Sequence, residues 1–187
     1  MPLEDVVDFI NEFVKANAIP HFYMGSIASS IHGRARSTED ADLVLLSAPA
    51  DVGAILDGIE AAGLSLGDRK GIVRQKLESG LPAKIAWDEI YSFDLRLASY
   101  SIDDEALNRA VIQKDLSGRE LRVAPPEEII VYKLARFIRR DKGDIKGILR
   151  AQESLDWPRI ERLAQQLTTE RNDPKILANL KIIKGWL

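Results

Sequence analysis

The spacing of apolar residues divides the sequence into a first part of mixed periodicity and a last part of helical periodicity. In the first part, helical spacing over residues 4–17 gives way to short apolar runs and to clear alternation over 91–97, which is typical of a strand. The elements predicted for this part are a helix at 4–17, a strand at 21–24, a helix from 25 to about 31, a strand at 40–46, a helix at 52–59, sheet at 69–78 and 83–87, a strand at 91–97 and a short strand at 119–123. Gly33 and Gly63 stand where the second and third helices should end.

From Glu127 onward the apolar positions recur every three to four residues, as they do in amphipathic helices. The predicted helices are one with a stripe at 130–138, a second with a stripe at 145–149, and two more near 156–167 and 174–184. The sequence therefore predicts a mixed α/β core over residues 1–124 and a helical extension over 125–187 that packs on it.

The residue types that are missing from the chain limit its chemistry. It contains no cysteine, which excludes disulfides, thiolate zinc sites and cysteine nucleophiles. Its two histidines, His21 and His32, are too few for a histidine-rich metal site. A bound metal would need oxygen ligands, which favours Mg²⁺, Mn²⁺ or Ca²⁺.

The overall composition is that of an ordinary globular protein. Apolar residues make up 45% of the chain and charged residues 29%, and the net charge is −3, which does not favour nucleic-acid binding by the chain as a whole. The longest apolar runs are far too short to span a membrane. The first residues include acids where a signal peptide would need bases, so we expect a cytoplasmic protein.

Residues 25–42 carry the strongest indication of function. Gly25-Ser26 follows a strand and opens a helix, and Asp40-Ala41-Asp42 opens the next strand. Taken separately, the first pair is an ordinary helix cap and the second an ordinary solvated turn. Taken together, a helix N-terminus with a serine hydroxyl suits phosphate, and two carboxylates at i and i+2 share one face of a strand and can hold hard cations.

A third acid lies on another predicted strand. Alternation over 91–97 places Asp94 on the face opposite Phe93 and Leu95, which is a poor position for a carboxylate without a partner. If this strand lies beside the strand at 40–46, Asp94 joins the pair of acids. The sequence alone leaves that adjacency as an inference.

These motifs resemble the signature of the DNA polymerase β-like nucleotidyltransferase superfamily. The string Gly25-Ser26-x-Ala28…Gly33-x-x-Arg36-x-Thr38-x-Asp40-x-Asp42, followed by Asp94, is similar to its small prokaryotic branch, which includes minimal nucleotidyltransferases and nucleotidyltransferase-like toxins of abortive-infection systems. The segment from Lys133 to Ile145 also resembles a Lys…Arg-Asp…Asp-Ile run of that branch. Thirteen residues separate Ser26 from Asp40, which is at the long end of the family spacing.

The resemblance implies a small mixed β-sheet with flanking helices, the nucleotidyltransferase fold, and specific roles for the motif residues. Gly25 and Ser26 would hold the β- and γ-phosphates of a nucleoside triphosphate. Asp40 and Asp42 would ligate two Mg²⁺ ions (or Mn²⁺), and Asp94 would ligate the first ion and help to deprotonate the attacking hydroxyl. The reaction implied is in-line attack at the α-phosphorus with release of pyrophosphate.

Two sets of basic residues are further candidates. Arg36, and with less support Arg34, could grip a triphosphate, the alternative being a solvated loop. A basic ridge is predicted on the helix after Pro126 from Lys133, Arg136, Arg139, Arg140 and Lys142. The ridge could be the solvated face of a helix or could contact phosphate or nucleic acid, and Lys133 is the candidate for phosphate contact. Asp144 is interpreted as the N-cap of the following helix.

The leading hypothesis is a metal-dependent nucleotidyltransferase that moves a nucleoside monophosphate to a hydroxyl of a tRNA 3′ end, a protein or a small molecule. The prokaryotic resemblance suggests a toxin–antitoxin or phage-defence setting with a cognate partner, by association alone. A second hypothesis is a nucleotidyltransferase-fold module that binds nucleotide without turnover and acts as an antitoxin or scaffold. A third is an α/β domain whose acids only cap turns.

Overall fold

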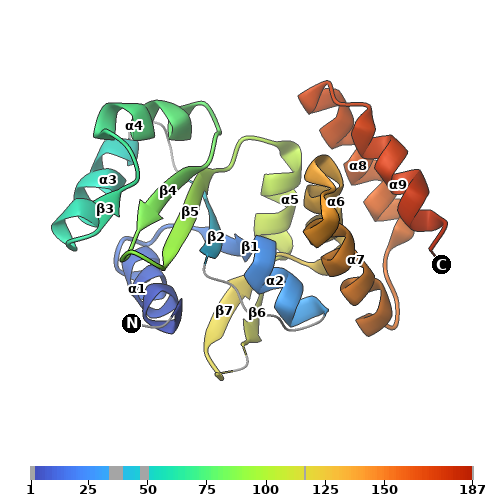
Figure 1. Cartoon of the computed structure of the whole chain (residues 1–187), viewed down its shortest axis with the longest axis horizontal. Helices are drawn as coiled ribbons and strands as arrows, with labels where there is room; N and C mark the ends of the chain where they lie inside the picture. Colours follow the sequence, from blue (N-terminus) through green and yellow to red (C-terminus); the bar gives the residue numbers. More distant parts are fainter. Residues whose placement is uncertain (1–2, 34–39, 47–50, 116, 187) are drawn as a thin grey trace. The chain divides into compact units, whose positions relative to one another are not determined.

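The computed structural model describes residues 3–33, 40–46, 51–115 and 117–186, and the chain forms two compact units (Figure 1). Unit 1 comprises Met1–Tyr23 and Ser37–Ser99, and unit 2 comprises Met24–Arg36 and Tyr100–Leu187. None of the helices in the described ranges is long and apolar enough to cross a membrane. The mixed α/β class predicted from the sequence is confirmed.

Unit 1 contains most of the strands. Its elements are α1 (Leu3–Ala16), β1 (His21–Met24), β2 (Asp40–Leu45), α3 (Val52–Ala61), β3 (Ser65–Leu66), α4 (Lys70–Glu78), β4 (Ala83–Ala86) and β5 (Ser92–Leu97). The strands lie in the order β3-β4-β5-β2-β1, with β2 and β5 parallel and with β4 antiparallel to β5. The predicted strands at 40–46, 83–87 and 91–97 are therefore confirmed and are neighbours in one sheet.

One face of this sheet forms the core of unit 1. Every second residue of β2 and β5 is almost fully buried, and these residues are Ala41, Leu43, Leu45, Phe93, Leu95 and Leu97. The helices α1 and α4 pack against the same strands. Because side chains of a strand alternate between faces, the intervening residues of β2 and β5 occupy the other face.

The prediction of sheet over residues 69–78 is wrong, because this segment forms the helix α4. Val73 and Leu77 are buried, and their spacing of four residues puts both side chains on one face of a helix. Arg74 and Glu78 form an ion pair of 2.7 Å with the same spacing on the solvent side. The strand in this region is the short β3, just before α4.

Unit 2 is largely helical. Its elements are α2 (Gly25–His32), α5 (Ser101–Arg109), β6 (Val111–Lys114), β7 (Glu120–Val123), α6 (Pro126–Arg136), α7 (Arg139–Ala151), α8 (Trp157–Arg171) and α9 (Lys175–Lys184). Strands β6 and β7 form an antiparallel hairpin. Figure 1 shows the four C-terminal helices, from orange to red, gathered side by side, and α6 contacts each of the other three. Neither α5 nor β6 is predicted from the sequence.

The chain turns sharply between α6 and α7, so the predicted stripe at 130–138 does not belong to one helix. Phe137 adopts a left-handed conformation with φ of 51°, and its N–H donates to the Lys133 carbonyl at 2.8 Å. The next residue, Ile138, donates its N–H to Asp141 Oδ2 at 3.2 Å, which caps the start of α7. The predicted ridge is therefore split between two helices.

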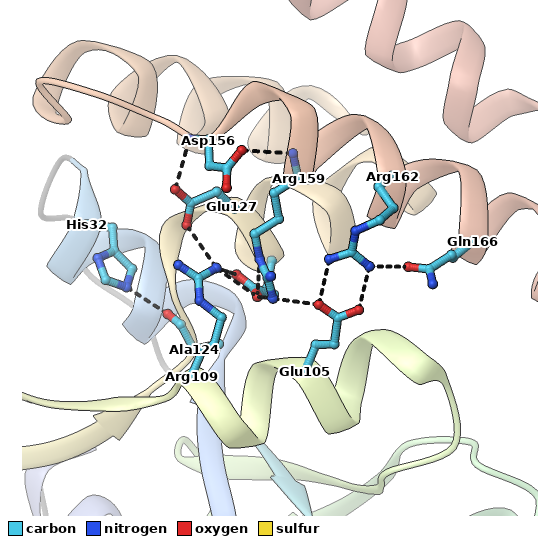
Figure 2. Close-up of polar contacts among 10 residues, drawn as sticks. His32, Glu105, Arg109, Ala124, Glu127, Asp156, Arg159, Arg162 and Gln166 are labelled. Atoms are coloured by element: carbon cyan, nitrogen blue, oxygen red, sulfur yellow. Dashed lines mark hydrogen bonds and ion pairs between the residues drawn. The ribbon is translucent and has the colours of Figure 1, made fainter.

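Helix α2 is held in unit 2 although its sequence precedes most of unit 1. His32 Nε2 donates to the Ala124 carbonyl at 2.7 Å (Figure 2), and Gln152 Nε2 donates to the His32 carbonyl at 2.7 Å. Gly33 ends α2 as predicted, but with a φ of −137° rather than a left-handed one. Glycine is needed there because a Cβ atom would lie 2.8 Å from the backbone nitrogen of Ile148.

The two compact units differ from the division predicted at residue 124. Residues 24–36 and 100–124 group with the C-terminal helices rather than with the strands of unit 1. The reason is visible in the contacts of α2, which packs on α6 and α7. Apolar periodicity reports the type of an element but not its distant packing partner.

Candidate carboxylate site

Asp42 and Asp94 are direct neighbours in the sheet of unit 1. In the parallel pairing of β2 with β5, the Cα atom of Asp42 is in register with that of Asp94. Neighbouring strands lie about 4.8 Å apart, and residues in register point to the same face. The two carboxylates therefore share the face opposite the apolar core, and the inferred adjacency of the two predicted strands is confirmed.

A lysine extends this row of charged side chains to a third strand. Lys84 of β4 is in register with Asp94, and its Nζ lies 3.8 Å from Asp94 Oδ1. The same ammonium donates to Ser92 Oγ at 2.9 Å. The Lys84 side chain is 53% exposed and that of Asp94 35%, so this ion pair is open to water. Water weakens the attraction within such a pair and leaves both groups accessible.

Sequence reasoning did not single out Lys84. The segment from Ala83 to Ala86 alternates buried and more exposed positions, which assigns Lys84 to a polar face. That alternation was readable from the sequence. The pairing of Lys84 with Asp94 was not, because it depends on the register between two strands.

Asp40 is the first residue of β2, in register with Ser92, and its side chain lies outside the described part of the protein. Among the side chains that are described, no group of three or more His, Asp or Glu residues forms a metal cluster. Asp42 and Asp94 nevertheless fit a hard divalent cation. They supply oxygen ligands only, from adjacent strands, on a face that is not sealed by the apolar core.

Gly25 and Ser26 begin α2 in unit 2. Gly25 has φ of +57°, a backbone conformation that residues other than glycine rarely adopt. The turn from strand to helix therefore requires glycine at this position. Ser26 does not cap the helix: the N-cap residue is Met24, and Ser26 is 7% exposed within the first turn. The carbonyl of Gly25 accepts from Ser29 Oγ at 2.6 Å, which fixes the first turn of α2.

The candidate arginines Arg34 and Arg36, together with Thr38, lie outside the described residues. Their proposed contacts with a triphosphate stay predictions.

Lys133 lies in the interior of unit 2. It is 5% exposed, and its Nζ is 2.7 Å from Asp144 Oδ2 and 3.7 Å from Asp141 Oδ1. Asp144 is a mid-helix residue of α7, so its interpretation as an N-cap is wrong, and Asp141 is the carboxylate that caps this helix. The ammonium of Lys133 thus links α6 to α7. Its predicted contact with phosphate is not tested by these bonds.

Asp141 is held charged by its surroundings. Burial by itself would raise the pKa of the carboxyl, but two hydrogen bonds from Arg136, of 2.9 and 2.7 Å, and the charge of Lys133 lower the pKa below its usual value. Arg136, predicted to be part of a basic ridge, is therefore also a bonding partner for a buried acid.

Comparison with solved structures relates the chain to proteins that transfer nucleotides. The antibiotic-resistance factor ANT(2″)-Ia in solution matches with a TM-score of 0.58 and 17% identity, over 90% of this chain and 92% of that one. The same factor in complex with adenylyl-2″-tobramycin matches with a TM-score of 0.56 and 19% identity, over 85% and 92%. The lincosamide antibiotic adenylyltransferase LnuA, with lincomycin bound, matches with a TM-score of 0.53 and 12% identity, over 80% and 98%. The chain has the nucleotidyltransferase fold.

No protein-family profile and no curated protein sequence matches the chain. At identities below 20%, the likeness of these structures establishes the fold and leaves the chemistry to be argued from the residues themselves. The residues that matter most for that argument are Asp42 and Asp94, because the fold places them side by side.

Proposed function

We propose that the chain is a metal-dependent nucleotidyltransferase that transfers a nucleoside monophosphate from a nucleoside triphosphate to a hydroxyl group. The observation that carries this proposal is the in-register pairing of Asp42 with Asp94 on the polar face of parallel strands. Asp42 and Asp94, 52 residues apart in sequence, are brought together on one face, where two carboxylates repel each other and cost stability unless a cation or another function uses them. The nucleotidyltransferase fold provides a reaction in which they would be used.

In this proposal Asp40, Asp42 and Asp94 hold Mg²⁺ or Mn²⁺, which neutralises charge on the triphosphate when bound. Asp94 also accepts the proton of the acceptor hydroxyl. Gly25 and Ser26 bind the β- and γ-phosphates, with support from the left-handed turn that only glycine makes easily. Arg36 and Lys133 remain further candidates for contact with the triphosphate.

The proposed step conserves atoms and charge. The acceptor oxygen forms a bond to the α-phosphorus while the bond from that phosphorus to the bridging oxygen of the β-phosphate breaks. Pyrophosphate leaves, and the hydroxyl proton passes to Asp94. Because positioning and charge neutralisation supply most of such a rate enhancement, no covalent intermediate with the protein is needed.

The acceptor in our proposal is a hydroxyl of a small molecule, a tRNA 3′ end or a protein. The structures of ANT(2″)-Ia with adenylyl-2″-tobramycin and of LnuA with lincomycin support the first class, through the fold alone. A setting in phage defence, with a cognate toxin or antitoxin partner, rests on the motif resemblance to the small prokaryotic branch.

One observation favours a second function, binding of nucleotide without turnover. The ammonium of Lys84 lies 3.8 Å from Asp94 Oδ1, so a protein cation already stands beside an acid that the transfer reaction needs. If this contact persists when nucleotide binds, Asp94 would neither ligate a metal nor accept a proton, and the chain would act as a binding module.

The test is incubation with each α-³²P-labelled nucleoside triphosphate and Mg²⁺ or Mn²⁺, with aminoglycoside and lincosamide antibiotics, total tRNA and protein lysate as acceptors. Transfer of label that disappears in the variant with Asp40→Ala and Asp42→Ala supports the proposal, and the labelled product identifies the acceptor class. The matched control is Glu89→Gln, which removes an exposed acid of unit 1 and should leave transfer unchanged. Metal-dependent nucleotide binding without transfer supports the binding module, and absence of both overturns the two functions together.

A further inference from the structure

We propose that helix α7 carries a binding surface for the phosphodiester backbone of a nucleic acid, formed by four cations in a row. This cationic stripe consists of Arg139, Lys142, Lys146 and Arg150. The surface belongs to unit 2 and does not depend on the nucleotidyl transfer proposed above. It also differs from the ridge predicted from the sequence, which included Lys133 and Arg136.

The four residues lie on one side of the helix. Their spacings of three, four and four residues return each side chain to the same face, and the row extends for about 16 Å at 1.5 Å per residue. All four are exposed. The opposite face of α7 is buried and consists of Asp141, Asp144, Ile145 and Ile148. The helix therefore separates its charges completely, with acids inside and bases outside.

The buried acids of α7 cannot neutralise the stripe, because they are already bonded elsewhere. Asp141 accepts from Arg136, and Asp144 accepts from Lys133 at 2.7 Å. Among the described residues, none of the stripe cations forms an ion pair with a carboxylate. The positive charge of the stripe is thus left for a ligand.

Several cations elsewhere in the same unit are paired with acids, whereas the stripe is a continuous row of cations on one helix face without such pairs in the described part of the chain. Arg162 makes two hydrogen bonds to Glu105, of 2.6 and 2.8 Å (Figure 2). Arg159 pairs with Glu105 and Glu128. Lys184 pairs with Glu161. Unit 2 thus matches many of its exposed cations with acids but leaves a continuous row on α7 without them.

Two features beside the stripe favour a nucleic acid over other polyanions. The rings of Phe137 and Trp186 are stacked, with centroids 6.1 Å apart, and the ammonium groups of Lys142 and Lys146 lie 4.7 and 4.8 Å from those rings. Phe137 is buried, so only the half-buried Trp186 of this pair can offer part of a ring to a base, beside cations that can contact phosphate. Gly143, near the middle of the stripe, has open space where a Cβ would stand, so a phosphate chain can approach the helix backbone.

A membrane surface fits less well. Peripheral membrane helices bury large apolar side chains next to their cations. Within the described residues of α7, every large apolar side chain is buried or half-buried, and the exposed Ile138 at its N-cap is one isoleucine rather than a row of apolar anchors. A phosphodiester backbone needs no such anchor, since it is bound through its charges.

The test is fluorescence anisotropy of the full chain with a short labelled single-stranded RNA, the DNA of the same sequence, and vesicles that contain phosphatidylserine. The variant replaces all four stripe cations by Gln, and the matched control is Lys114→Gln, an exposed lysine of unit 2 outside the stripe. We expect RNA binding with a slope of log affinity against log salt of about −3 for four phosphate contacts. The fourfold variant should lose at least tenfold in affinity, and the control should bind as the wild type.

Equal binding of RNA and DNA supports recognition of the backbone, and a preference for RNA supports it with an added contact to the ribose hydroxyl. The proposal is overturned if affinity does not depend on salt, if the fourfold variant binds like the control, or if vesicles bind through the stripe while nucleic acids do not. Because these titrations contain neither nucleoside triphosphate nor divalent metal, their outcome does not depend on the transfer reaction, and a failure of that reaction is distinguishable from a failure of this surface. Circular dichroism melts verify that each variant is folded.

Discussion

The two units treat their carboxylates in opposite ways. In unit 2, Glu128 and Asp141 are fully buried, and each accepts short hydrogen bonds from arginine, of 2.6 Å from Arg159 and 2.7 Å from Arg136. In unit 1, the Asp94 side chain is 35% exposed, and the Nζ atom of Lys84 lies 3.8 Å from its Oδ1 atom. The first arrangement uses charge to join helices, while the second leaves carboxylate oxygens accessible to a ligand.

This difference gives a physical criterion for reading acids in a fold. A buried carboxylate must be bonded, because an unpaired one costs several kcal/mol, so tight pairing indicates a structural role. A carboxylate that is partly exposed to water on a polar sheet face carries no such requirement. The contrast predicts that substituting a buried acid of unit 2 lowers the stability of the protein, while substituting Asp94 of unit 1 lowers its transfer activity.

The largest effect is expected for Asp94→Asn on transfer. The amide cannot accept the hydroxyl proton and is a weaker metal ligand, so the rate should fall by about 10²–10⁴-fold. The melting temperature should change little, since Asp94 lies on the open face of the sheet. Steady-state kinetics and thermal melts measure the two quantities. A lowered melting temperature together with an unchanged transfer rate would contradict the prediction and would assign Asp94 a structural role.

The converse is expected for Glu128→Gln. Its carboxylate also accepts from Arg109 at 3.3 Å, and its loss removes the buried partner of Arg159, whose side chain is 15% exposed. The free energy of unfolding should fall by about 3 kcal/mol, at the low end for a buried pair because Arg159 keeps Glu105 as a partner. Urea unfolding measures this loss, with Glu89→Gln as the control, and a change below that of the control would contradict the structural role.

Lys84→Met tests whether Lys84 competes with a metal ion for the Asp94 carboxylate. Removing a cation beside Asp94 should strengthen binding of Mn²⁺ by up to about fivefold, the effect expected for an exposed ion pair. Calorimetry with Mn²⁺ and no nucleotide measures this affinity directly. Lys84→Arg keeps the charge and should bind Mn²⁺ as the wild type does. Weaker binding in Lys84→Met would instead mean that the lysine holds Asp94 in place.

The smallest effect is expected at His32. Burial lowers its pKa, although the bond to Ala124 and the charges of Glu127 and Glu128 oppose the shift. The unfolded chain therefore binds the proton first, near pH 6.5, and the stability that neutral His32 contributes is lost as the pH falls from 6.5 toward its lowered pKa. In urea unfolding, the advantage of wild type over His32→Gln should shrink between pH 7.5 and 5.5. An advantage that grows on acidification would mean that the two glutamates stabilise the protonated ring.

The sequence predicted those parts of the fold in which burial follows a simple period. Strands β2 and β5 were predicted to within one residue at their boundaries, because β2 is polar at its start and apolar further along, while β5 alternates between apolar and polar positions. Strand β6 escaped prediction because all four of its residues are exposed, so there is no alternation to detect. Helix α4 was mistaken for sheet because it buries only Val73 and Leu77, too few to display a helical period.

The candidate site was predictable only as a set of residue types. Spacing placed Asp42 and Asp94 on polar faces of strands, but their register depends on which strands pair. Lys133 shows the opposite limit. A lysine on a predicted basic helix is expected to be exposed to solvent, yet Lys133 is buried and bonded to Asp144, eleven residues later. The turn that brings the two residues together leaves no periodic signal in the sequence.

The long-range anchoring of α2 has a consequence for the order of events during synthesis. The bond from Gln152 to the His32 carbonyl joins residues 120 positions apart, and the one from His32 to Ala124 spans 92. At about 5–20 residues per second, α2 is synthesised roughly 6–24 s before Gln152. Until α6 and α7 have been made, its buried face lacks these native partners. The nascent chain should therefore need a chaperone most during the synthesis of residues 33–152.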